Sequence, residues 1–183
     1  MRLSLPLLLL TLLFILPVGA DSGNIKPPTG IRVYAIGPAP DFELDDMDGN
    51  RDSLSSGQGQ WVFLHFWASW CGPCRKEMPA IQRMARLMEN QPLKIQLVNT
   101  AEDEDTVFSF LGGVAPDMTT LMDRDGEVTE VWKPRGLPAT YLIDPQGQVR
   151  YQALGGRPWD QPEYLGFLKA LVRSASGTTY DSP

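Results

Sequence analysis

The pattern of apolar and polar positions predicts two buried strands with a helix between them. Residues 61–67 (Trp-Val-Phe-Leu-His-Phe-Trp) are almost continuously aromatic or branched, which is typical of a strand buried on both faces. Residues 93–99 predict a second central strand. Residues 73–89 instead carry apolar side chains at helical spacing, namely Met78, Ile81, Met84, Ala85 and Met88. We interpret this stripe as the inner face of a helix.

The remaining segments predict short strands, turns and two further helices. The expected elements are a hairpin of residues 41–44 and 51–54, a helix over 103–111 that ends at Gly112-Gly113, a strand over 119–123, a hairpin of 139–144 and 148–154, and an amphipathic helix over 161–174. Strands alternate with helices before an antiparallel pair. The predicted fold class is therefore α/β, a sandwich in which helices flank a central mixed β-sheet, with an N-terminal β-hairpin extension.

The first twenty residues have the pattern of a secretory signal peptide. Arg2 precedes a mostly apolar run over residues 3–16, and residues 17–20 end in small side chains. The run is shorter than the roughly 20 apolar residues that span a bilayer. We expect cleavage after Ala20 and a periplasmic location, the alternative being an uncleaved anchor that holds the domain at the periplasmic face. The expected organisation is a signal peptide (1–20), a linker (21–38), one domain (39–173) and a disordered tail (174–183).

Charge and cysteine content narrow the function classes. The full chain has a net charge of −6, and removal of the single Arg in residues 1–20 leaves 15 basic and 22 acidic residues, or −7. This balance argues against nucleic acid as a partner. Cys71, Cys74 and the single histidine, His65, are too few to form a tetrahedral zinc site. We expect neither a metal nor a cofactor.

The two cysteines have the spacing of a redox couple. A strand ending at Trp67 and a helix beginning near Pro73 would place Cys71 at the helix N-terminus, where unpaired N–H groups and the helix dipole stabilise a thiolate. Cys74 would lie about one turn into the helix. Cys71 is then the exposed attacking thiol and Cys74 the buried resolving thiol. Gly72 leaves the approach to the sulfur open.

At this point the chain resembles a known family. Residues 67–74 (Trp-Ala-Ser-Trp-Cys-Gly-Pro-Cys) resemble the active site of thioredoxin-fold oxidoreductases. The continuation over 75–79 (Arg-Lys-Glu-Met-Pro) is similar to the exported TlpA/ResA-like branch. Residues 39–42 (Ala-Pro-Asp-Phe) match a segment that this branch shares with redoxins, and 136–140 (Gly-Leu-Pro-Ala-Thr) match a loop whose proline is cis. The resemblance covers roughly residues 39–172 and implies a thioredoxin-like fold.

The resemblance also implies parts of the site. Pro138 would be cis and face the disulfide, which keeps the backbone of Leu137 free to pair with an extended substrate segment. We expect Trp70, Gly72, Pro73 and Leu137 to bind substrate.

Two residues are candidates for proton transfer. In the TlpA/ResA-like branch an acidic residue just after the second central strand lies beneath the cysteines, and Glu102 has that place in the sequence. A desolvated carboxylate could accept the Cys74 proton, although Glu102 begins an acidic run and could be a plain surface acid. His65 stands six residues before Cys71, where thioredoxins carry a buried aspartate. It is either the proton relay or a packed, hydrogen-bonded core residue.

We therefore expect an exported thiol–disulfide oxidoreductase that acts as a protein-disulfide reductase. The resemblance implies protein dithiol or disulfide substrates, a role in cytochrome c maturation or in exported-protein redox homeostasis, and a membrane reductant of the DsbD/CcdA type. We expect a monomer. A redoxin-like thiol peroxidase and a copper-binding module on the same fold are alternatives. The cysteines lack the Pro-x-x-x-Thr-x-x-Cys setting of the former and the Cys-x-x-x-Cys spacing of the latter.

Overall fold

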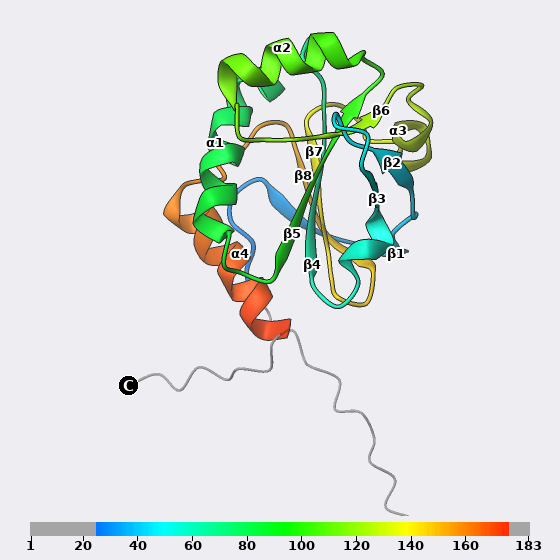
Figure 1. Ribbon diagram of the computed structural model, residues 1–183. Helices are drawn as coiled ribbons and strands as arrows, with labels where there is room; N and C mark the ends of the chain where they lie inside the picture. The colour runs from blue at the N-terminus through cyan, green and yellow to red at the C-terminus, as the bar shows by residue number, and fades with distance from the viewer. Residues whose placement is uncertain (1–24, 176–183) are drawn as a thin grey trace, which may run out of the picture.

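The computed structural model describes residues 25–175, so the expectations for the signal peptide, for residues 21–24 and for the tail beyond Ala175 fall outside the described part. A six-stranded sheet with the order β1-β8-β7-β4-β5-β6 forms the centre of the fold (Figure 1), and β2 and β3 form a separate hairpin. Within residues 25–175, no helix has the length and apolar character needed to cross a membrane.

The strands are β1 (Ile31–Pro38), β2 (Glu43–Asp45), β3 (Arg51–Ser53), β4 (Trp61–Trp67), β5 (Leu93–Thr100), β6 (Leu121–Asp123), β7 (Ala139–Ile143) and β8 (Gln148–Leu154). The helices are α1 (Gly72–Met88), α2 (Glu104–Val114), α3 (Glu127–Trp132) and α4 (Pro162–Ala175), with a short 3₁₀ helix η1 (Leu54–Gly57).

The sheet is mixed, as the sequence predicts. β4, β5 and β6 run parallel, whereas β7 pairs antiparallel with β4, and β8 pairs antiparallel with both β7 and β1. In the register, Trp67 at the end of β4 lies beside Asn99 of β5, and Phe66 lies beside Ala139 at the start of β7. The carboxyl ends of the two central strands therefore meet the amino end of β7 at one edge of the sheet.

Every residue of β4 is buried, because β4 contributes to two apolar clusters. Trp61, Phe63 and Trp67 face the cluster that α1, α2 and α4 cover. The alternate positions Val62, Leu64 and Phe66 face the cluster covered by η1 and α3. Figure 1 shows α1 and α4 on one side of the sheet and α3 with the β2–β3 hairpin on the other. Because alternate residues of a strand point to opposite faces of the sheet, β4 can bury every position of an unbroken apolar run.

Three elements differ from the prediction. Residues 31–38, assigned to the linker, form β1 at the edge of the sheet, because β8 provides a pairing partner that the local sequence does not reveal. Helix α2 continues through Gly112 and Gly113 to Val114. Helix α3 was not predicted, since six residues are too few to show a helical period. The buried Asp123 carboxylate anchors the start of α3 by accepting hydrogen bonds from the backbone N–H groups of Val128 and Thr129.

Candidate active site

Cys71 caps the N-terminus of α1. Its sulfur accepts a hydrogen bond from the Cys74 backbone N–H at 3.3 Å, and Pro73 occupies the first turn, where its missing N–H costs no helical hydrogen bond. The two sulfurs are joined in a disulfide, with the Cα atoms 5.2 Å apart. Cys71 is 5% exposed and Cys74 is fully buried. Cys71 is therefore buried in the oxidised protein and not exposed as predicted, although Cys74 is covered more completely.

The surface around Cys71 combines an open approach with one large exposed ring. Trp70 is 69% exposed, whereas Trp67 is fully buried and donates from its indole N–H to Thr120 Oγ1 at 3.0 Å. A Cβ at Gly72 would meet no atom within 4 Å, so the space beside this residue is open. These positions suit Trp70 to contact a substrate and Trp67 to hold the loop on the core.

The Leu137–Pro138 peptide bond is cis. Pro138 is buried directly before β7, and its carbonyl accepts a hydrogen bond from the Gly155 N–H at 2.8 Å. Leu137 is half-buried and packs against both apolar clusters. The pairing of Ala139 with Phe66 places this loop beside the end of β4, the strand that leads to Cys71.

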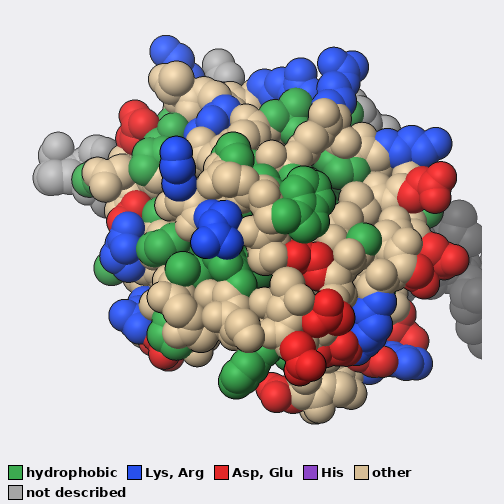
Figure 2. Space-filling model, turned by 90° about the horizontal axis from the view of Figure 1, so that it is seen from above, with side chains coloured by type: hydrophobic (Ala, Val, Ile, Leu, Met, Phe, Trp, Pro, Cys, Tyr) green, Lys and Arg blue, Asp and Glu red, His purple; other side chains and the backbone are tan. Residues whose placement is uncertain are grey.

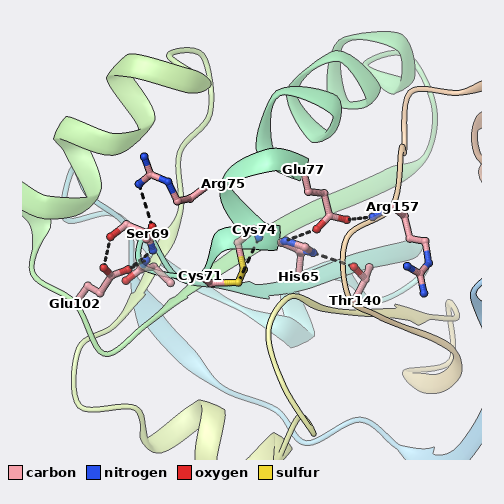
Figure 3. Close-up of a disulfide and its surroundings, with 10 residues drawn as sticks. His65, Ser69, Cys71, Cys74, Arg75, Glu77, Glu102, Thr140 and Arg157 are labelled. Atoms are coloured by element: carbon pink, nitrogen blue, oxygen red, sulfur yellow. Dashed lines mark hydrogen bonds and ion pairs between the residues drawn. A yellow bond between two sulfur atoms is a disulfide. The ribbon is translucent and has the colours of Figure 1, made fainter.

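A second acidic residue, Glu77, lies behind the cysteines and was not predicted as a site residue. It follows Cys74 by three positions on α1 and is only 4% exposed. Its Oε1 accepts hydrogen bonds from the Arg157 backbone N–H at 2.9 Å and from the indole N–H of Trp159. Its Oε2 has no hydrogen-bond partner and lies 3.8 Å from His65 Nε2 (Figure 3).

Burial dominates the electrostatics of Glu77 and His65. Loss of solvent raises the pKa of Glu77 to about 7, against the weaker lowering effects of the Arg157 N–H, the Trp159 indole and the Arg157 charge. Burial lowers the pKa of His65 to about 3. At pH 7 the His65 imidazole is therefore neutral, and the Glu77 carboxyl gains or loses its proton near this pH. The contact between the two side chains is not an ion pair, because the imidazole carries no charge.

His65 is held by the neighbouring strand. Its Nδ1 shares a hydrogen bond of 2.8 Å with Thr140 Oγ1, and the two residues are register partners across β4 and β7. The imidazole thus connects the loop of Pro138 to the carboxyl of Glu77. This places His65 in the core, hydrogen-bonded, with one ring nitrogen facing an acid.

Glu102 hydrogen-bonds the loop that precedes Cys71. Its Oε2 accepts hydrogen bonds from the Ser69 backbone N–H and from Asn99 Nδ2, both at 2.7 Å, and its Oε1 accepts from the Ser69 hydroxyl. Figure 3 shows Glu102 and Glu77 on opposite sides of the disulfide. None of these hydrogen bonds involves Cys74. The loop after β5 directs the Glu102 carboxylate towards Ser69.

Glu77 escaped prediction because its sequence context looks like a solvated surface. It follows the exposed residues Arg75 and Lys76 in a charged run, yet Glu77 itself lies on the buried face of α1. The useful signal is spacing, since positions three apart share one face of a helix and Cys74 faces the core.

Among residues 25–175, no group of three or more His, Cys, Asp or Glu side chains could hold a metal ion.

A groove passes beside the first turns of α1, and Glu77 contributes to its lining. It has a volume of about 630 Å³ and lies between the first turns of α1 and the loop before α4, with Gly72, Lys76, Glu77 and Arg157 among its lining residues. Figure 2, which looks down on the α2 end of the molecule, shows acidic side chains gathered along one margin and basic side chains spread over the opposite side.

Comparison with known proteins places the chain in a family. Residues 37–152, more than half of the chain, match the AhpC/TSA family model. The thiol-disulfide oxidoreductase ResA of Bacillus subtilis (strain 168) is 36% identical over 111 residues, which are 61% of this chain and 62% of the relative. The ResA of Oceanobacillus iheyensis is 31% identical over 146 residues, 77% of this chain and 75% of the relative.

A solved structure supports the same placement. A thiol:disulfide interchange protein DsbE of Chlorobium tepidum superposes with a TM-score of 0.65 at 32% identity, covering 75% of this chain and 99% of that one. The predicted thioredoxin-like fold is therefore confirmed. The chain belongs to the AhpC/TSA family of thioredoxin-fold proteins and is similar in sequence to the ResA thiol–disulfide oxidoreductases.

Proposed function

We propose that this protein is an exported thiol–disulfide oxidoreductase that reduces disulfide bonds in other proteins. The observation that carries the proposal is the Cys71–Cys74 disulfide at the N-terminus of α1 with a buried, near-neutral carboxyl behind it. The relatives' names support this activity. The chain spans about 62% of the length of B. subtilis ResA, so activity, substrates and partners are inferences for this chain.

In the proposed reaction the reduced enzyme attacks first through Cys71. Its thiolate forms a bond to one sulfur of the substrate disulfide, and the other substrate sulfur leaves as a thiolate that takes up a proton. Cys74 then loses its proton, attacks the Cys71 sulfur and expels the second substrate sulfur. Two electrons pass to the substrate, and the enzyme ends in the oxidised form of this structure.

We assign the acceptor of the Cys74 proton to Glu77. Glu77 follows Cys74 by three positions on the same helix and retains one oxygen without a hydrogen bond. A carboxyl with a pKa of about 7 suits proton transfer at neutral pH. His65 is too weak a base for this role, because burial lowers its pKa to about 3. Its neutral ring positions the Glu77 carboxyl instead.

The substrate would bind over Trp70, Gly72, Pro73 and Leu137. Trp70 offers an exposed aromatic surface beside Cys71, and the space beside Gly72 is open. The Leu137 backbone, held by the cis Pro138, would pair with an extended substrate segment. The groove beside Glu77 would admit the residues that flank the target cysteine.

The signal-peptide pattern of residues 1–20 supports a periplasmic location, with a membrane anchor as the alternative. A reductant in an oxidising compartment must itself be reduced, and a membrane thiol-transfer protein of the DsbD/CcdA type would supply the electrons. Substrates would include apocytochrome c, which carries a Cys-x-x-Cys-His site, or other exported proteins with wrong disulfides. We infer a monomer.

Insulin reduction tests the activity. We expect the wild-type protein, with dithiothreitol as electron source, to accelerate insulin reduction, and we expect Cys71→Ser to abolish the acceleration. Cys74→Ala should retain the first step and accumulate mixed disulfides. When this variant is expressed with residues 1–20 and recovered from the cell envelope, mass spectrometry would identify the trapped proteins and the processed N-terminus.

Two outcomes would contradict the proposal. Rapid peroxide consumption with a sulfenic acid on Cys71 and no insulin reduction would indicate a thiol peroxidase. Stoichiometric Cu(I) binding without thiol–disulfide exchange would indicate a copper module.

A further inference from the structure

We propose that Glu102 is a positioning residue that clamps the loop carrying Trp70 and Cys71, and that it takes no part in proton transfer. The inference deepens the proposed function, because it identifies what holds the attacking cysteine at the end of α1. It rests on the contacts of the β4–α1 loop, and Figure 3 shows Ser69 and Glu102 on the side of the disulfide away from Glu77.

Both donors of Ser69 bind Glu102. The Ser69 backbone N–H donates to Oε2 at 2.7 Å, and the Ser69 hydroxyl donates to Oε1. Asn99 Nδ2 donates to the same Oε2 at 2.7 Å, and Asn99 is fully buried in β5. The carboxylate therefore joins the loop, two residues before Cys71, to a fixed side chain of the central sheet.

The backbone before Glu102 is fixed as well. Ala101 has a left-handed φ of 55°, which is unfavourable for a residue with a Cβ and persists only where the surroundings enforce it. Its N–H donates to the Asp123 carbonyl of β6 at 2.9 Å. Glu102 is thus presented to Ser69 from a constrained turn and not from a free surface loop.

Helix α1 holds the opposite side of the same loop. Arg75 Nη1 donates to the Ser69 carbonyl at 3.2 Å, and the Arg75 guanidinium lies 5.0 Å from the centre of the Phe110 ring of α2. The Cys71 N–H closes the turn onto the Ala68 carbonyl at 3.2 Å. Every hydrogen-bonding group of Ser69 is therefore engaged, which fixes the direction in which the chain enters α1.

The clamp and a plain electrostatic effect predict opposite results. If Glu102 acts only as a negative charge near Cys71, its removal favours the thiolate and lowers the pH at which Cys71 becomes reactive. If Glu102 holds the loop, its removal lets Cys71 leave the helix N-terminus, and the thiolate loses the N–H groups that stabilise it. The pH at which Cys71 becomes reactive then rises.

The test measures the alkylation rate of reduced Cys71 by iodoacetamide against pH, in the Cys74→Ala background so that one thiol reacts. We expect Glu102→Ala and Ser69→Ala each to raise the pH midpoint of Cys71 alkylation. Ser69→Thr keeps the hydroxyl and should have the midpoint of the parent protein. Ser69→Ala is informative because it changes no charge. Glu89→Gln removes an exposed carboxylate just after the far end of α1 and should leave the midpoint unchanged.

Insulin reduction in the Cys74-containing protein gives the second readout. Glu102→Ala removes three hydrogen bonds, two of them to the loop, and should raise KM about five- to tenfold with a smaller change in kcat. The double variant with Ser69→Ala should be little worse than Glu102→Ala alone, because both remove the same contact. Thermal unfolding of each variant checks that the fold is retained.

Three outcomes would overturn the inference. A lowered midpoint in Glu102→Ala with no effect of Ser69→Ala would make Glu102 a plain charge. Loss of kcat with accumulation of the mixed disulfide would restore the proton acceptor role. Unchanged values in every variant would leave Glu102 without a role. Since alkylation needs no protein substrate, the clamp can be judged even if the protein fails to reduce insulin.

Discussion

At the scale of single residues, the site depends on one carboxyl group that the fold keeps out of water. Glu77 has two hydrogen-bond donors on Oε1 and none on Oε2 among the described residues, and a neutral imidazole nitrogen lies 3.8 Å from Oε2. Two donors are too few to stabilise a fully buried carboxylate, so the pKa of Glu77 is raised to about 7. A group of this kind loses a proton easily at neutral pH, and its ionisation also destabilises the fold.

The first residue-scale prediction concerns stability against pH. The folded protein binds the Glu77 proton more tightly than the unfolded chain, so the free energy of unfolding falls as pH rises from the ordinary carboxyl value of 4.5 through about 7. We expect Glu77→Gln to gain about 2–3 kcal/mol relative to wild type between pH 5 and pH 8. Urea unfolding of the oxidised proteins at both pH values measures the difference.

His65 should change the free energy of unfolding with pH in the opposite direction to Glu77. Burial lowers its pKa to about 3, so its contribution to stability is lost as pH falls from 6.5 towards 3, the opposite direction. Between pH 4.5 and 6.5 the two groups should largely cancel in wild type. A parallel pH dependence of wild type and Glu77→Gln would show that Glu77 titrates normally, contrary to this account.

The residues of the site differ in how far the sequence reveals them. Cys71 and Cys74 lie in a short motif whose geometry is local, so the helix cap was predictable, whereas the cis bond before Pro138 was expected only from the family resemblance. Glu77 and Glu102 are both acids in charged runs, and the charge pattern alone does not distinguish a buried carboxylate from an exposed one. Their roles depend on the Gly156–Trp159 loop and on Ser69, which are contacts made only in the folded protein.

At the scale of elements, segments with a local pattern were predictable, and segments that depend on distant partners were not. β4, β5, α1 and α4 lie where the sequence places them, within a few residues. α3 and β1 owe their formation to partners distant in the chain, namely Asp123 and β8. The two glycines of α2 were read as a helix end, yet the helix continues because Val114 and Ala115 extend its packed face.

The continuation of α2 leads to a prediction about glycine. Gly112 and Gly113 are exposed, have no positive φ, and would place a new Cβ in open space. Each therefore weakens the helix without a compensating contact, and Gly112→Ala and Gly113→Ala should each stabilise the protein by about 0.5–1 kcal/mol. Thermal unfolding should show a rise of a few degrees for the double variant.

Gly30 is the contrasting position. Its φ is +79°, and a Cβ there would overlap the guanidinium of Arg157. Arg157 also donates from its side chain to the Gly30 carbonyl at 3.1 Å. Gly30→Ala should therefore destabilise the protein by more than about 1 kcal/mol. If the substitutions at Gly112 and Gly113 were equally harmful, glycine in α2 would have a role beyond the helix backbone.

At the scale of the whole molecule, the fold brings four distant segments around one disulfide. β4 supplies His65 and the cysteine loop, the turn after β5 supplies Glu102, the loop before β7 supplies Pro138, and the loop before α4 covers Glu77. Parallel β4 and β5 place their carboxyl ends at the same edge, which is where α1 begins. The topology thus surrounds the couple with a clamp on one side and a proton acceptor on the other.

This arrangement couples proton uptake to reduction, which predicts how the midpoint potential depends on pH. Above the pKa of the Cys71 thiol, reduction adds two electrons and one proton, on Cys74, and the potential falls by about 30 mV per pH unit. The new thiolate on Cys71 is a like charge near Glu77 and raises the pKa of Glu77 beyond the value of about 7 in the oxidised protein. Glu77 should therefore take up part of a second proton on reduction.

We expect the wild-type slope between pH 7 and pH 9 to lie between about 30 and about 60 mV per pH unit, and the Glu77→Gln slope to stay near about 30. Equilibration with glutathione buffers, followed by alkylation and mass spectrometry, measures both proteins over the pH range in which Cys71 is already ionised. The charge lost in Glu77→Gln also shifts the absolute potential, so the comparison uses slopes. Equal slopes would mean that Glu77 does not sense the thiolate, and the acceptor of the Cys74 proton would then have to be solvent.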